Sequence, residues 1–209
     1  MLITDIIEID KKRDKIYIDN EFAFVLYKGE LHLYNIKIGN ALTEATYNQI
    51  INEVIIKRVR LRAMNLLTKK DYTEAQLRKK LLDGYYKDEI VDKALEYVKS
   101  YGYIDDERYI KSYFAIHILS KPRKLIEQKL IEKGISTKLL EEIVDDIYEE
   151  ERFLTKVPDE LEMGRNLLDK KKYDIVNSPS DRQKAYGYLL RRGISSESAI
   201  KLLKEYQKA

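Results

Sequence analysis

Three short clusters of arginine and lysine are the side chains in this chain best suited to bind an anionic partner. They comprise Arg78, Lys79 and Lys80, then Lys121, Arg123 and Lys124, and finally Arg191 and Arg192. Guanidinium and ammonium groups donate hydrogen bonds to phosphate and carboxylate oxygens, so single- or double-stranded DNA and acidic protein surfaces are all suitable partners. Solvated surface charge explains any one of these residues. The set as a whole favours binding, which would weaken as salt rises.

Charge is unevenly distributed along the sequence, although the formal net charge is only +3. Residues 57–80 contain nine basic and two acidic side chains, whereas every charged residue of 141–151 is acidic. A polarised chain of this kind suits a charged partner, and the acidic run is most simply an exposed helix face.

Few residue combinations here suggest catalysis or metal binding. Asp105, Asp106 and Glu107 offer the oxygen ligands that magnesium and calcium prefer, but the start of a predicted helix explains these carboxylates without a metal. His32 and His117 are isolated, cysteine is absent, and there is no phosphate-binding glycine loop. We therefore expect a binding protein and not an enzyme, with no metal and no cofactor.

No run of about 18 apolar residues is present, so no membrane span is expected. The N-terminus lacks a basic start followed by an apolar core, which argues against a secretory signal. The absence of cysteine fits a reducing compartment, so we expect the protein in the cytoplasm.

The first 40 residues alternate apolar and polar side chains, which predicts a small antiparallel sheet. We expect strands over 2–9, 14–19, 22–28 and 31–35, with a turn at Asp19-Asn20. Beyond residue 40 the apolar period is helical. The first predicted helix covers 44–68, and other helices follow to the end of the chain. Predicted helix starts are Thr43, the capping box Thr73–Gln76, Asp105, Pro122, Ser136 or Thr137, Ser178 and Ser195, and predicted ends are Gly84, Gly134 and Gly193.

Three stretches of the helical part resemble one another at a period of roughly 50 residues, which indicates a helical repeat protein. Equivalent apolar positions are Leu81, Leu130 and Leu189, and likewise Val91, Leu140 and Ala199. The predicted fold is mainly α, with three tandem three-helix repeats that form an elongated curved array behind the N-terminal β module. We place the module at 1–40 and the repeats at 41–102, 103–150 and 151–209.

Four segments, in order, resemble the RecX family of regulators of the RecA recombinase. They are AMNLLTKKDYTEAQLRKKL at 63–81, YGYIDDERYIKSY at 101–113, KPRKLIEQKLIEKGI at 121–135 and RRGISSESAIKLL at 191–203. The residues that match the family's signature are Tyr103, Asp105, Asp106, Arg108, Tyr109, Gly134 and Gly193. The resemblance covers roughly residues 57–206, while residues 1–40 correspond to a variable extension in the family.

The resemblance implies a protein that binds the RecA–DNA filament and modulates it, with inhibition as the expected sense. ATP hydrolysis, strand exchange and the coprotease reaction of the SOS response would then be reduced, and recombination with them. The resemblance also implies that Tyr101, Tyr103, Tyr109 and Tyr113 are buried between the first two repeats. Stacking of these rings on nucleic-acid bases is the alternative. We expect a monomer.

Two other functions stay open at this point. Thr73–Leu82 and Lys87–Lys99 can be interpreted as a helix-turn-helix of a DNA-binding transcription regulator, with the N-terminal hairpin as a wing. Against that interpretation, the motif occurs three times and the second helix carries four acidic residues. A general helical-repeat scaffold for another protein is the third possibility.

Overall fold

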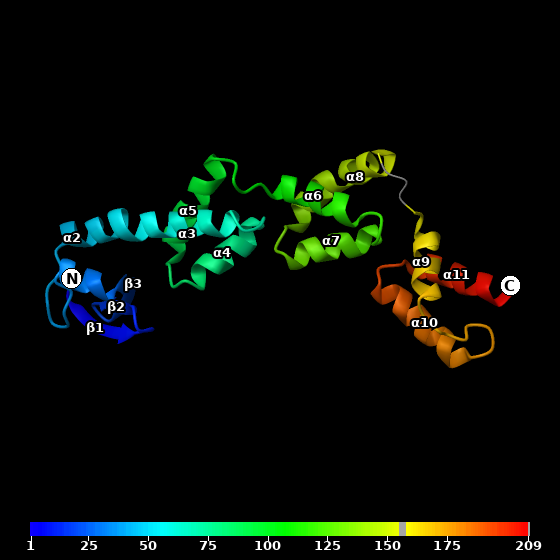
Figure 1. Ribbon diagram of the computed structural model, residues 1–209, viewed down its shortest axis with the longest axis horizontal. Coiled ribbons are helices and arrows are strands. Elements are labelled where there is room, and N and C mark those ends of the chain that lie inside the picture. Colours follow the sequence, from blue (N-terminus) through cyan, green and yellow to red (C-terminus); the bar gives the residue numbers. More distant parts are fainter. Residues whose placement is uncertain (155–157, 209) are drawn as a thin grey trace. The chain divides into compact units, whose positions relative to one another are not determined.

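The computed structural model describes residues 1–154 and 158–208, which are mainly helical with a small sheet at the N-terminus (Figure 1). Residues 155–157 and Ala209 belong to the predicted third repeat and lie outside the described residues. The chain divides into two compact units, Met1–Asp105 and Asp106–Ala209. Among the described helices, none has the length and apolar character needed to cross a membrane.

The sheet contains β1 (Ile3–Glu8), β2 (Arg13–Ile18) and β3 (Glu21–Tyr27), paired antiparallel in that order. Asp19 and Asn20 join β2 to β3 as a two-residue turn in which both residues have positive φ. Asparagine and aspartate tolerate that conformation well, which is why they mark tight hairpins. The first three predicted strands and this turn are therefore confirmed.

The predicted fourth strand at 31–35 is wrong, because the chain forms a short helix there, α1 (Lys28–Leu33). Glu30 closes its first turn by accepting a hydrogen bond from the backbone N–H of Tyr27 at 2.8 Å. The same carboxylate forms an ion pair with Arg58, a residue far away in the sequence. The alternation of apolar and polar residues over 31–35 suggested a strand, but Leu33 is 74% exposed and does not enter the core.

The predicted helix over 44–68 is helical throughout but not uniformly α. It consists of α2 (Glu44–Gln49), the π-helical segment η1 (Ile50–Ile55) and α3 (Ile56–Leu67). Thr43 caps its start, with the side-chain oxygen accepting from the N–H of Thr46 at 3.1 Å. Apolar side chains of this helix pack in one core with the sheet and the first repeat.

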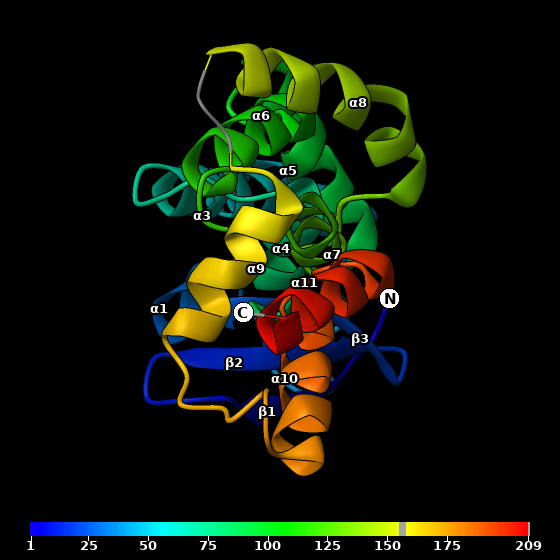
Figure 2. The ribbon, with the colours of Figure 1, turned by 90° about the vertical axis from the view of Figure 1, so that its right-hand side faces the viewer.

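Each of the three repeats has three helices. The first has α3, α4 (Glu74–Leu82) and α5 (Asp88–Ser100); the second has α6 (Asp106–His117), α7 (Arg123–Glu132) and α8 (Thr137–Leu154); the third has α9 (Glu160–Asp169), α10 (Pro179–Arg191) and α11 (Ser196–Lys208). The equivalent residues Leu81, Leu130 and Leu189 are all fully buried. Figure 2 shows α9 beside α10 and α11, against which it packs. The prediction of tandem three-helix repeats behind a β module is confirmed.

Helix ends follow local rules that the sequence displays. Thr73 and Gln76 form the expected capping box, and Ser178 and Ser195 accept from backbone N–H groups at the starts of α10 and α11. Gly134 has a φ of 88°, and its N–H donates to the carbonyl of Ile131 while Ile135 donates to that of Leu130. This pair of hydrogen bonds is a Schellman motif, which requires the left-handed conformation that glycine adopts without strain. Gly193 ends α10 in the same way.

Candidate functional site

The three predicted basic clusters lie at different positions within their helices. Arg78, Lys79 and Lys80 occupy the second half of α4, whereas Lys121 precedes α7 and the rest of its cluster occupies that helix's first turn. The third cluster forms the end of α10. The clusters therefore do not occupy equivalent positions of the repeat. The repeat pattern alone does not place them on a common surface.

The arginines of the first two clusters form ion pairs with carboxylates of their own repeats. Arg78 forms an ion pair with Asp92 on α5 and lies 3.7 Å from Asp88. Arg123 donates from Nε to Glu127 at 2.6 Å and from its guanidinium to Asp145 on α8. Burial alone would lower the pKa of Arg123, but these carboxylates raise it. Both arginines thus join neighbouring helices, and their charge is balanced by internal partners.

Lys79, Lys80, Lys124, Arg191 and Arg192 are exposed and present their charge to solvent. Lys121 is half-buried, with Nζ 3.2 Å from His117 Nδ1. Burial lowers the pKa of His117, and the positive charges of Lys121 and Lys133 lower it further, which keeps the imidazole neutral near pH 7. The exposed members are the ones whose charge is available to a partner.

The carboxylates at the start of α6 occupy a position that a helix favours electrostatically. Asp106 and Glu107 lie in its first turn, and Asp105 directly precedes it. Carboxylates stabilise this end of a helix because the macrodipole is positive there. Within the described residues, no group of three or more histidine, cysteine, aspartate or glutamate side chains is arranged to hold a metal ion.

The prediction that the linker tyrosines are buried is wrong for two of them. Tyr101 is 60% exposed and Tyr103 is 50% exposed, while Ile104 is buried. The two exposed rings stack on each other with centroids 5.8 Å apart. Positive φ at Gly102 turns the chain so that Ile104, rather than a tyrosine, enters the core. Tyr109 and Tyr113 are half-buried against the core of the second repeat.

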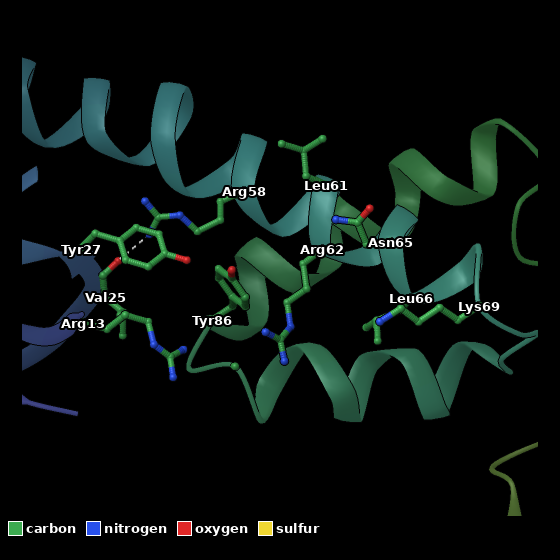
Figure 3. A pocket seen from close by; sticks show the side chains of 11 residues that line it. Arg13, Val25, Tyr27, Arg58, Leu61, Arg62, Asn65, Leu66, Lys69 and Tyr86 are labelled. Carbon is green, nitrogen blue, oxygen red and sulfur yellow. Dashed lines mark hydrogen bonds between the residues drawn. The ribbon is translucent and has the colours of Figure 1, made fainter. Parts of the chain in front are cut away.

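One basic site was not predicted from the sequence, a pocket of about 400 Å³ within the first unit (Figure 3). Its cationic side chains are Arg13 from β2, Arg58 and Arg62 from α3, and Lys69 just beyond α3. The spacing of four between Arg58 and Arg62 places both on one side of the helix. That spacing was visible in the sequence, but the approach of the sheet to this helix face was not.

Aromatic rings form part of this pocket. Tyr27 and Tyr86 line it, and the guanidinium carbon of Arg58 lies 4.5 Å from the centroid of the Tyr27 ring. Burial raises the pKa of Tyr86 although the charges of Arg58 and Arg62 oppose that shift, so its phenol stays protonated. The pocket is therefore lined by cationic and tyrosine side chains together.

A series of three-helix repeats with exposed basic side chains is typical of binding proteins. The family model described as "RecX, first three-helix domain" matches residues 60–97. "Regulatory protein RecX" of Caldanaerobacter subterraneus subsp. tengcongensis is 30% identical over 205 residues, covering 97% of this chain and 98% of the relative. The RecX of Clostridium acetobutylicum is 27% identical and covers 97% of this chain and 95% of the relative. The chain belongs to the RecX family of regulatory proteins, as the sequence motifs predict.

Solved structures of the family have the same fold. A crystal structure of regulatory protein RecX superposes with a TM-score of 0.54 at 23% identity, covering 98% of each chain. A second, of RecX from Lactobacillus salivarius, has a TM-score of 0.53 at 19% identity over 74% of this chain and 98% of the other. At these identities the likeness supports the fold alone.

Proposed function

We propose that this protein binds the RecA–DNA filament and inhibits its ATP hydrolysis, strand exchange and coprotease activity, which regulates recombination and the SOS response. The observation that carries this proposal is membership of the RecX family over nearly the whole chain. The mechanism is steric and electrostatic: the repeats occupy a surface that neighbouring recombinase protomers need for growth or rearrangement. This mechanism requires no cofactor and no catalytic residue.

Exposed members of the basic clusters are proposed to make the contact. Lys79, Lys80, Lys124, Arg191 and Arg192 present their charge to solvent, whereas Arg78 and Arg123 are engaged with carboxylates. Their targets are acidic surfaces of the recombinase or phosphates of the DNA that it holds. We further propose that the protein acts as a monomer in the cytoplasm, where such filaments form.

The direct test is DNA-dependent ATP hydrolysis by the cognate recombinase on single-stranded DNA. The protein is added at a molar ratio of roughly one to fifty, and the initial rate and its decline are followed. Strong inhibition at this ratio supports a block to filament growth, because simple coating would need near-equal amounts. An unchanged rate at equimolar protein, with helix content verified by circular dichroism, would refute the proposal.

The helix-turn-helix alternative is weakened by the first repeat. In that interpretation α5 would enter the DNA major groove, yet its first turn carries Asp88 and Glu89. Asp92, one turn further, is the ion-pair partner of Arg78. Acidic side chains at the N-terminal end of a recognition helix repel DNA phosphates. Sequence-specific duplex binding through α5 is therefore disfavoured.

A further inference from the structure

We propose that the pocket between the sheet and α3 is a phosphate site for single-stranded nucleic acid, which the first unit binds directly, without the recombinase. Four cationic side chains line it, and among the described lining residues there is no acidic one. Arg13 and Arg58 form ion pairs with Asp10 and Glu30, so the uncompensated positive charge of the cavity comes from Arg62 and Lys69, and this charge attracts an anion. This inference is independent of filament inhibition, since it concerns the protein and nucleic acid alone.

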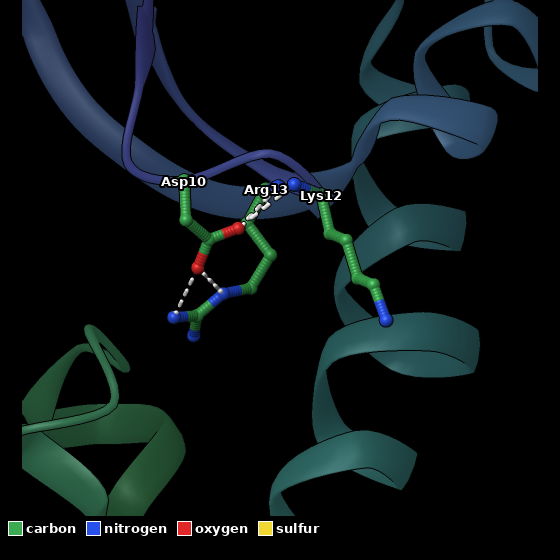
Figure 4. A network of polar contacts seen from close by, with 3 residues as sticks. All are labelled: Asp10, Lys12 and Arg13. Carbon is green, nitrogen blue, oxygen red and sulfur yellow. Dashed lines mark hydrogen bonds and ion pairs between the residues drawn. The ribbon is translucent and has the colours of Figure 1, made fainter.

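Two of the arginines are fixed in place before any ligand arrives. Arg13 is oriented by Asp10, whose Oδ2 accepts from Nε at 2.9 Å and from the guanidinium at 2.7 Å (Figure 4). The other oxygen of Asp10 accepts from the backbone N–H groups of Lys12 and Arg13. Arg58 donates to the carbonyl of Val25 at 3.1 Å and pairs with Glu30. Preorganised donors of this kind lose little conformational entropy when they bind an anion.

The remaining two cations, Arg62 and Lys69, form no ion pair within the part of the chain that the structure describes. Arg62 extends from α3 toward the space beside Tyr86, as Figure 3 shows. Its Nε is buried without a hydrogen-bond partner, and no ion pair joins Arg62 or Lys69 to an acidic residue of the described chain. A buried donor without a partner costs free energy, and an anion in the pocket would supply the missing acceptor.

The rings favour a nucleic acid over an acidic peptide. Proteins that bind single strands combine cations for the backbone with aromatic faces for the bases. Tyr27 and Tyr86 line the pocket beside the arginines, with the Arg58 guanidinium over one face of the Tyr27 ring. An acidic peptide would use the cations but would leave the ring faces without a specific role.

The test measures binding of the full chain to a fluorescein-labelled 20-nucleotide oligothymidylate by anisotropy, without recombinase, over a series of salt concentrations. Arg62→Gln combined with Lys69→Gln is expected to weaken binding at least tenfold. It should also reduce the slope of log affinity against log salt by about 1.4, which is 0.7 for each of two phosphate contacts.

Arg60→Gln is the matched control. Arg60 lies on the same helix, is also half-buried and also has a buried Nε without a partner, but it faces Tyr97 and does not line the pocket. This variant should bind as the unmodified protein does. The proposal would be overturned if the double variant and the control lost the same affinity for the oligonucleotide, or if the unmodified protein did not bind it.

Two competitors identify the source of the anion. Thymidine monophosphate at millimolar concentration should displace the oligonucleotide only weakly, because it offers a single phosphate and base. Micromolar competition by the mononucleotide would instead assign the pocket to a free nucleotide and overturn the assignment to a strand. Polyglutamate that binds in a manner dependent on Arg62, while the oligonucleotide does not bind, would overturn it in favour of an acidic protein partner.

Discussion

Glu160 should make the stability of the third repeat depend on pH. It lies in the first turn of α9, and its carboxylate accepts hydrogen bonds from the start of α11. The donors are Ser195 N–H at 2.8 Å, Ser195 Oγ at 2.6 Å and Ser198 Oγ. Burial alone would raise the pKa of Glu160, but hydrogen bonds from Ser195 and Ser198 lower it below the ordinary value of 4.5.

The expected magnitude follows from these hydrogen bonds. A hydrogen bond to a charged group contributes roughly 1.5–3 kcal/mol, and Glu160→Gln keeps one acceptor oxygen while it places an NH₂ donor against the serine donors. We therefore expect the free energy of unfolding of the third repeat to fall by about 2 kcal/mol at pH 7. Because the folded-state pKa is depressed, the contribution of Glu160 is complete above its unfolded pKa and is lost as pH falls through the folded value.

Hydrogen exchange of the amides at the start of α11, with urea unfolding of the full chain, measures this contribution at pH 7 and pH 3. Glu162→Gln is the matched control, since Glu162 occupies the same first turn of α9, is exposed and forms no side-chain hydrogen bond or ion pair with α11 among the described residues. The difference between the unmodified protein and Glu160→Gln should be largest at pH 7 and smaller at pH 3. A difference that does not shrink between pH 7 and pH 3, or equal effects of the two substitutions, would refute the reasoning.

Other substitutions test the packing and the charges. Gly193→Ala should lower the free energy of unfolding by about 2–4 kcal/mol in urea denaturation, because its Cβ would lie 2.8 Å from that of Leu125 and its φ is positive. At Gly102, φ is also positive but no atom lies near the position of an added Cβ, so Gly102→Ala should lower the free energy of unfolding by only about 1–2 kcal/mol. Equal losses of stability for the two substitutions would contradict the close approach of residue 193 to Leu125. Arg123→Gln should lower the melting temperature by loss of its ion pairs, worth about 1 kcal/mol at this partial exposure, whereas Lys124→Gln should leave it unchanged and weaken filament binding. The opposite pattern in calorimetry and binding would show that Arg123, not Lys124, contacts the partner.

Helices and their ends could be predicted from the sequence because their determinants are local. The capping box at Thr73, the caps Ser178 and Ser195, and the terminal glycines Gly134 and Gly193 each act within a few residues of themselves. Apolar periodicity likewise determines which face of a helix is buried without reference to distant residues. The architecture of three repeats was therefore predictable from the sequence.

Features that depend on distant residues were not predictable. Helix α1 replaces an expected strand because Glu30 meets Arg58, which is 28 residues away in the sequence. The pocket depends on the meeting of β2, α3 and the segment after α4. Three of its cations, Arg58, Arg62 and Lys69, belong to the basic stretch 57–80, but nothing in the sequence indicated that Arg13 would join them. The internal pairing of Arg78 and Arg123 was missed for a similar reason: Asp92 and Asp145 lie on the following helix of each repeat.

A departure from the repeat pattern coincides with the proposed phosphate site. Where the other repeats have Gly134-Ile135 and Gly193-Ile194, the first has Tyr85-Tyr86. Tyr85 adopts a φ of 62°, a conformation that costs a non-glycine residue roughly 1–2 kcal/mol.

Strain of this kind persists where the surrounding structure or a function requires it. Here the exchange replaces the buried isoleucine of the other repeats with Tyr86, whose ring lines the pocket. Gly84 allows the close approach, because a Cβ there would lie 3.0 Å from both the Leu81 carbonyl oxygen and the Tyr86 ring. The first repeat thus has a strained helix end at Tyr85 and places the aromatic side chain of Tyr86 in the same pocket as Arg62, a combination that fits the proposed site for a nucleic-acid strand.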